Sequence, residues 1–255
     1  MIMKNKTGLV MGMANEYSIA YGIAKSLISN GADVIFTAQS ERLKQKILDI
    51  EEFKNSRVYI CDVCDDSNID DVFYSIKEEY DSIDFLVHSI AFSDKNELKG
   101  KYYNTSRDNF LNAMNISCFS LTKVCQYANS IMPNGGSIVT LTYYGAEKTV
   151  PNYNVMGVVK AALESSGRYL ATDLGEFNIR INAVSAGPIK TLASSGVGEF
   201  SKVLDYEKNR SPLKRNITQE EIGNACTFLL SDLSSGITGE ILHVDCGCNT
   251  VGIKF

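Results

Sequence analysis

The 255-residue chain has an ordinary globular composition, with 44% hydrophobic and 22% charged residues, and its length suits one α/β domain. A net charge of −5 argues against a protein that binds nucleic acid as a whole, and no apolar run approaches the ~20 residues of a membrane span. The apolar run 9–14 is too short and too early for a signal peptide, so we expect a soluble, cytoplasmic protein.

The seven cysteines are an odd number without a disulfide-like framework, which is typical of reduced thiols. Cys61 and Cys64 form a C-x2-C pair, and Cys246 and Cys248 form C-x-C, so a zinc site is conceivable. Both histidines lie on apolar strands elsewhere, however. We therefore interpret the cysteines as small buried hydrophobic residues and expect no metal site.

The chain begins with a predicted buried strand, Thr7–Met11, followed by a helix over Ile19–Ile28 with Ser18 as its N-cap. Between them, Gly12 would let the chain turn and a ligand approach, and Gly22 would let helix and strand pack closely. Free N–H groups at the helix N-terminus suit a pyrophosphate, although an ordinary strand–helix turn has the same pattern.

A second strand is predicted at Ala32–Thr37 and a third at Arg57–Cys61. A dinucleotide-binding fold usually has an acidic residue after its second strand to bind the adenosine ribose. Here Gln39 takes that place, and its amide can also bond to ribose hydroxyls. Nearby Arg42 raises the alternative of a 2′-phosphate. Asp62 follows the third strand, and one interpretation of it is a helix N-cap.

The next predicted elements are a helix over Asn68–Tyr80, a strand over Asp84–Ile90, a long helix from about Thr105 to Ile131, and a strand over Ser137–Leu141. Tyr143 stands at the end of this last strand.

Pro151-Asn152 opens a further helical pattern, whose predicted apolar side comprises Val155, Val158, Val159 and Ala162. Tyr153 and Lys160 lie seven positions apart, about two helical turns, so we expect both side chains on one face. A cation favours a phenol that donates a strong hydrogen bond. An isolated pair of this kind would be an interface tyrosine and a solvated lysine, but this pair follows a strand end, where open α/β sheets bind ligands.

The remaining predicted elements are a strand over Ile179–Val184, a helix over Gln219–Leu230 and a strand over Glu240–Asp245. The Gly-rich stretch 191–198 is either a surface loop or a mobile lid, and its place after a strand favours the lid. Strands alternating with helices predict an α/β fold, a single-domain, Rossmann-type doubly wound parallel sheet of about seven strands with helices on both faces.

Tyr153-x6-Lys160, preceded by Tyr143, together with SIAYGIA at 18–24 and SAGPIKT at 185–191, resembles the bacterial enoyl-(acyl-carrier-protein) reductases. These enzymes are a divergent branch of the short-chain dehydrogenase/reductase family, whose ketone-reducing members have Tyr-x3-Lys. That position is Gly157 here. The resemblance covers nearly the whole chain and implies reduction of the trans-2 double bond of enoyl-carrier thioesters by NADH, with NADPH less favoured. It also implies an acyl carrier protein as partner and a homotetramer.

The resemblance implies site roles as well. Tyr153 would stabilise charge on the thioester oxygen, Lys160 would hold the nicotinamide ribose, and Tyr143 would line the acyl site as proton donor or positioning group. Asp62 would bind the adenine amino group, and 191–210 would form a substrate-binding lid. The implied cofactor-binding residues are Gly12, Ser18, Ile19, Gln39, Asp62, Val63, Ser89, Ile90, Ala91, Lys160, Ile189, Thr191, Leu192 and Ala193, and the substrate-binding residues are Ser93, Tyr143 and Tyr153.

Two other functions stay open. A short-chain dehydrogenase acting on a keto or hydroxy substrate would need Thr140 or Thr142 in place of the usual serine, and an NAD(H)-binding sensor would have no need of the Tyr153/Lys160 pair.

A basic cluster flanks the predicted substrate mouth. Segment 190–215 carries six basic and three acidic side chains, an excess of three positive charges in an acidic chain. This charge suggests a docking site for the acidic carrier, although a solvated helix face has the same composition.

Overall fold

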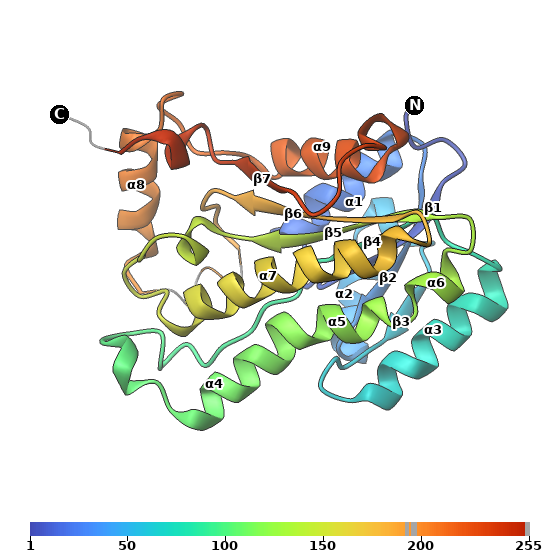
Figure 1. Cartoon of the computed structure of the whole chain (residues 1–255), viewed down its shortest axis with the longest axis horizontal. Coiled ribbons are helices and arrows are strands. Elements are labelled where there is room, and N and C mark those ends of the chain that lie inside the picture. Colours follow the sequence, from blue (N-terminus) through green and yellow to red (C-terminus); the bar gives the residue numbers. More distant parts are fainter. Residues whose placement is uncertain (192–193, 195–197, 253–255) are drawn as a thin grey trace.

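The computed structural model describes residues 1–191, 194 and 198–252 (Figure 1). A parallel sheet runs through it in the order β3-β2-β1-β4-β5-β6-β7, which confirms the predicted fold class. The strands are β1 (Thr7–Met11), β2 (Asp33–Ala38), β3 (Val58–Ile60), β4 (Phe85–His88), β5 (Gly136–Thr142), β6 (Ile179–Ala186) and β7 (Ile241–Val244).

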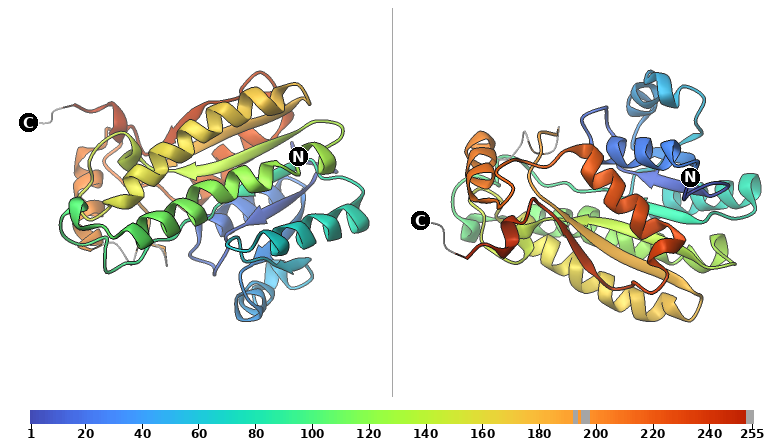
Figure 2. Two further views of the ribbon diagram at one scale, coloured as in Figure 1. Left: turned by 60° about the horizontal axis from the view of Figure 1, so that its bottom comes forward. Right: turned by 90° about the horizontal axis from the view of Figure 1, so that it is seen from above.

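Helices cover both faces of the sheet (Figures 1 and 2). They are α1 (Ile19–Ser29), α2 (Glu41–Leu48), α3 (Asp66–Tyr80), α4 (Arg107–Met114), α5 (Ser120–Cys125), α6 (Ala128–Ile131), α7 (Val155–Gly175), α8 (Phe200–Arg210) and α9 (Gln219–Leu230). One apolar core lies between the sheet and α3–α7, and a second between the sheet and α1, α2 and α9. Leu9 faces the first core and the next residue, Val10, faces the second, as expected for a parallel strand buried on both sides.

The strand order reverses at β1, which pairs with β2 on one side and with β4 on the other. In open α/β sheets, ligands bind outside the carboxyl ends of the strands at such a switch point. Gly12 follows β1 and Ser89 follows β4, so the predicted cofactor turn lies at the expected place.

Gly22 has a different role from the predicted one. A Cβ there would lie 2.6 Å from the carbonyl oxygen of Gln219, and a Cβ at Gly223 would lie 2.4 Å from the carbonyl oxygen of Gly22. The two glycines therefore let α1 and α9 pack closely against each other, so the expectation of helix–strand packing is wrong.

The predicted long helix 105–131 is interrupted. A π-helical turn, Asn115–Phe119, separates α4 from α5, and α6 is a further short piece. Ser117 Oγ accepts from the backbone N–H of Phe92 and donates to its carbonyl, at 2.8 and 3.1 Å. Ser120 Oγ donates to the carbonyl oxygen of Ile116 at 2.6 Å. Side-chain hydroxyls that bond into the helix ladder, or across to a neighbouring loop, are a usual cause of such interruptions.

Two smaller predictions also need correction. Six cysteines are buried as expected, but Cys64 is exposed. Helices α2 and α8 were not predicted, and α8 occupies much of the segment interpreted as a lid. In the described part of the chain, none of the helices combines the length and apolar character needed to span a membrane.

Candidate active site

The turn after β1 has the geometry of a phosphate-binding turn. Gly12 has φ +89°, and a Cβ there would lie 2.0 Å from the carbonyl oxygen of Ser89, so only glycine fits. Ser18 precedes α1, but its hydroxyl accepts from the backbone N–H groups of Ala14 and Asn15, at 3.1 and 3.2 Å. Ser18 is the N-cap of α1 as predicted, but its side chain closes the preceding turn and makes no capping hydrogen bond, so the first N–H groups of α1 have no side-chain acceptor from Ser18.

The residues predicted to bind adenosine meet at the ends of β2 and β3. The Gln39 amide donates to Asp62 Oδ2 at 3.3 Å, and Asp62 Oδ1 accepts from the backbone N–H of Cys64 at 3.0 Å. Asp65, not Asp62, caps α3, so the alternative of Asp62 as a plain N-cap is wrong. Val63 and Ile19 are partly buried against the two cores.

Backbone and side-chain hydrogen bonds hold the chain after β4. Ser89 donates its N–H to the carbonyl oxygen of Met11 at 3.2 Å. Ile90 is partly buried, and Ala91 is exposed. Ser93 donates to Asn109 Oδ1 at 3.2 Å, so its hydroxyl already has a partner on α4.

Tyr153 lies in the turn before α7, which begins at Val155. Asn152 and Asn154 have φ of 61° and 41°, values that a right-handed helix does not have. Tyr153 therefore lies outside the helix, and the prediction that Tyr153 and Lys160 share a helical face is wrong. The Asn154 amide donates to the carbonyl oxygen of Leu98 at 2.9 Å and holds this turn in place. On α7, Val155 and Val159 are buried as predicted, but Val158 is exposed.

Gly157 and Gly145 bring the start of α7 against the segment after β5. A Cβ at Gly157 would lie 2.7 Å from the Gly145 carbonyl oxygen, and one at Gly145 would lie 2.5 Å from the ring of Tyr153. No side chain therefore fits four positions after Tyr153, where the ordinary short-chain pattern has its lysine.

Lys160 is buried, and its Nζ donates to the carbonyl oxygen of Leu141 at 2.7 Å. Burial lowers the pKa of its ammonium group to about 8. The ammonium is thus bound at the carboxyl end of β5, because Leu141 lies two residues before Tyr143.

The rings of Tyr143 and Tyr153 are in edge contact, with centroids 5.0 Å apart. The Tyr143 hydroxyl is buried and lacks a hydrogen-bond partner in the described part of the chain. Burial raises the pKa of both phenols, so both groups are protonated donors at neutral pH. A buried donor without a partner is suited to receive a ligand oxygen.

His88, which the sequence analysis did not single out, is buried at the end of β4. Its ring nitrogens lie 3.1 Å from Thr140 Oγ1 and 2.8 Å from Ser120 Oγ. Burial lowers the pKa of His88 to about 3, so the ring is neutral. A histidine in an otherwise apolar strand was the available signal.

A model of the family described as enoyl-(acyl carrier protein) reductase matches residues 12–249. The chain belongs to this family. It is 54% identical over 254 residues to enoyl-(acyl-carrier-protein) reductase (NADH) 1 of Rhizobium meliloti, which covers 99% of this chain and 93% of the relative.

Solved structures of enoyl reductases have the same fold. The enzyme of Anaplasma phagocytophilum in complex with NAD has a TM-score of 0.96 at 52% identity, covering 100% of this chain and 98% of that one. The enzyme of Bacillus cereus with NADP⁺ and an indole naphthyridinone has a TM-score of 0.96 at 49% identity, covering 99% of each chain.

In this member of the enoyl reductase family, the segment after β6 returns toward the same edge of the sheet. Ile189 is partly buried against the second core. Thr191 and Ser194 exchange hydrogen bonds, with the Thr191 N–H donating to Ser194 Oγ at 2.7 Å. Leu192 and Ala193, also predicted to bind cofactor, lie outside the described residues.

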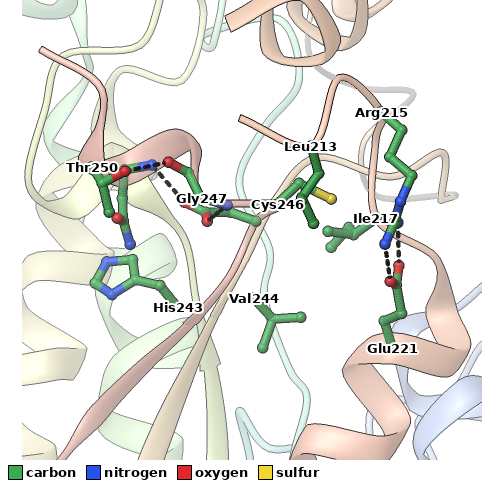
Figure 3. Close-up of a pocket in the computed structure, with 11 residues that line it drawn as sticks. Leu213, Arg215, Ile217, Glu221, His243, Val244, Cys246, Gly247 and Thr250 are labelled. Carbon is green, nitrogen blue, oxygen red and sulfur yellow. Dashed lines mark hydrogen bonds and ion pairs between the residues drawn. The ribbon is translucent and has the colours of Figure 1, made fainter. Parts of the chain in front are cut away.

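A cleft of about 340 Å³ lies beside β7 (Figure 3). Its lining includes His243, Val244 and the ion pair of Arg215 with Glu221. It contains neither Tyr143, Tyr153 nor Lys160, so it is separate from the candidate active site of this enoyl reductase family member.

Proposed function

We infer that the protein is an NADH-dependent enoyl-(acyl-carrier-protein) reductase, which reduces the trans-2 double bond in the last step of the type II fatty-acid elongation cycle. The observation that carries this inference is the contact of Tyr143 with Tyr153, beside a buried Lys160 and with Gly157 in the place of the usual lysine. Family membership and relatives named as NADH enzymes support the same reaction.

The residues of the chain fit NADH. The Gly12 turn and the start of α1, which has no side-chain capping hydrogen bond, suit the pyrophosphate, and the Gln39/Asp62 pair suits the adenosine. We propose that the other predicted residues of this crevice hold the cofactor too, and that Lys160 binds the nicotinamide ribose. The carboxylate of Asp62 beside Gln39 disfavours a 2′-phosphate there. Arg42 is the residue that would bind this phosphate if NADPH were used.

When bound, NADH supplies a hydride to the β-carbon of the enoyl thioester, and negative charge develops on the thioester oxygen. We propose that the Tyr153 hydroxyl donates a hydrogen bond to this oxygen and stabilises the charge. Its raised pKa keeps the phenol protonated for this task. Tyr143 then lines the acyl site, where its buried hydroxyl would donate or position, and Ser93 borders the substrate.

The alternative of keto reduction loses support, because both candidate substitutes for the usual serine are already engaged. Thr140 Oγ1 lies 3.1 Å from a ring nitrogen of His88, and Thr142 donates to Glu164 at 2.6 Å. The deciding assay follows the loss of NADH absorbance with a 2-enoyl thioester, such as the crotonyl thioester, beside a 3-ketoacyl thioester. Turnover of the enoyl substrate alone supports the proposal, and preference for the ketoacyl substrate contradicts it.

We further propose an acyl carrier protein as the partner, a homotetramer in the cytoplasm, and a single reductase domain in which 191–210 covers the substrate. Exposed apolar side chains on α4, α7 and the intervening π-helical turn support self-association; they are Leu111, Phe119, Val158 and Tyr169. Size-exclusion chromatography with light scattering tests the tetramer, and a monomeric mass would contradict it.

A further inference from the structure

Glu164 is a buried carboxylate on α7, four residues after Lys160, and is 9% exposed. Removing a charge from water is costly unless the charge is paired. Residues four apart on a helix are neighbours, so Lys160 and Glu164 lie on the same side of α7.

Two polar contacts join this side of α7 to the end of β5. Lys160 Nζ donates to the carbonyl oxygen of Leu141 at 2.7 Å, and the hydroxyl of Thr142 donates to Glu164 Oε1 at 2.6 Å. Adjacent residues of β5 are thus held by side chains of opposite charge. Tyr143 is the next residue, so these contacts also fix the end of β5 that positions Tyr143.

We propose that Glu164 is a positioning residue whose buried negative charge keeps Lys160 in its ammonium form for binding the cofactor ribose. This role rests on the function proposed above for Lys160. Glu164 does not need to touch the substrate or the cofactor, because its charge acts through Lys160.

The groups around Lys160 are consistent with this role. Burial lowers the pKa of Lys160, and Cys118 and Glu164 raise it. The ring of His88 on β4 is neutral, and Glu164 is the carboxylate among the groups that raise the pKa of Lys160. Glu164 is therefore the negative partner of Lys160 at neutral pH. Its charge also helps raise the pKa of Tyr153, mainly a result of burial and of Tyr143, and so favours the protonated phenol.

The surroundings of Glu164 both oppose and support its ionisation. Burial raises its pKa most, the Thr142 hydroxyl lowers it, and Glu147 after β5 raises it. Arg168, one turn further along α7, and His243 on β7 lower it. Lys160, Glu164 and Arg168 thus alternate in charge at intervals of four residues along α7, from the interior to the surface.

The test is the dissociation constant of NADH, measured by fluorescence from pH 6 to 9.5. In the wild type, affinity falls as pH rises through about 8, where Lys160 loses its proton. In Glu164→Gln the amide still accepts from Thr142 but carries no charge. We expect its fall in affinity about one pH unit lower, and about fivefold weaker binding at pH 8 with little change at pH 6.

Three further variants separate charge from packing. Glu164→Asp keeps the charge but not the reach to Thr142, and should follow the wild-type pH profile. Glu164→Met fills the volume without charge, and should shift the profile like Glu164→Gln, which gives a second neutral variant if the first does not fold. Glu147→Gln removes a nearby exposed charge as the matched control, and should leave the profile unchanged.

The contrary result is a wild-type pH profile of NADH affinity in both neutral variants, or weaker binding by the same factor at every pH. Either result would mean that Glu164 only stabilises the local structure. Lys160→Met distinguishes this failure from failure of the cofactor-binding role proposed for Lys160. If the fall in affinity persists in Lys160→Met, Lys160 does not bind through its charge and both proposals fall. If the fall disappears there but is unmoved in Glu164→Gln, only the role of Glu164 is overturned.

Discussion

The ring of Tyr143 meets the ring of Tyr153 edge-on, with an angle of 78° between the planes. Tyr143 directly follows β5, whereas Tyr153 lies in the turn before α7, so this contact joins two segments that each reach the same edge of the sheet. The structure thus brings together two protonated phenols, of which the proposed reaction needs one as the oxyanion donor.

Tyr153→Phe removes only that donor. We expect kcat to fall by about 10²–10³, the usual effect of losing one oxyanion donor, with NADH affinity nearly unchanged. Tyr143→Phe, the matched control, should act more on KM for the enoyl thioester. Steady-state kinetics of both variants check this, and the opposite order of effects would make Tyr143 the donor.

Gly157→Ala should destabilise the protein. Its Cβ would lie 2.7 Å from the Gly145 carbonyl oxygen, and the overpacking should outweigh the helix propensity of alanine, for a net loss of about 1–2 kcal/mol. Gly167→Ala on the same helix meets nothing within 4 Å and should gain about 0.5–1 kcal/mol. Urea unfolding of both variants gives the signs, and stabilisation by both would disprove the close approach.

Much of the fold could be predicted because apolar strands and helices alternate regularly along the chain. All seven strands and helix 219–230 lie within a few residues of their predicted positions. The interruption of the helix after Met114 could not be predicted, because it depends on hydrogen bonds of Ser117 with Phe92 and of Ser120 with Ile116 within a helical pattern. Local periodicity contains no information on such partners.

The candidate site was predicted by residue type but not by local geometry. The spacing of Tyr153 and Lys160 suggested one helical face, but the positive φ angles of Asn152 and Asn154 place Tyr153 before the helix. His88 and Glu164 were missed because burial, which gives them their roles, is a property of the packed fold.

His88 makes stability depend on pH. Its pKa is about 3 in the folded protein and about 6.5 in an unfolded chain, so below pH 6.5 only the unfolded state binds this proton. The free energy of unfolding should therefore fall with falling pH, by at most about 1.4 kcal/mol per pH unit from this group. Urea unfolding at pH 5, 6 and 7 should show a smaller slope for His88→Gln. A slope for His88→Gln equal to that of the wild type would contradict this role of His88.

The proposed carrier docking site depends on the basic residues near α8. Lys202 pairs with Glu199 and Arg215 with Glu221, whereas Lys208 is exposed and has no ion pair within the described ranges. Reversing Lys202 and Lys208 to Glu should raise KM for a carrier-bound substrate, more strongly at low salt.

The same double variant should leave KM for a coenzyme A thioester of equal chain length nearly unchanged, because that substrate lacks the carrier surface. Lys77→Glu on α3, at the other end of the molecule, is the control for a charge reversal far from α8 (Figure 1). Equal damage to both substrates would assign these lysines to the fold of the lid instead.

We propose that the enzyme delivers hydride to the β-carbon of an enoyl thioester. The most direct measurement supplies NADH with deuterium at both C4 positions of the nicotinamide and a trans-2-enoyl thioester, and locates the deuterium in the product by NMR and mass spectrometry. We expect one deuterium at C3 and a hydrogen from solvent at C2 of the saturated acyl chain. A saturated product without deuterium at C3 would contradict this proposal.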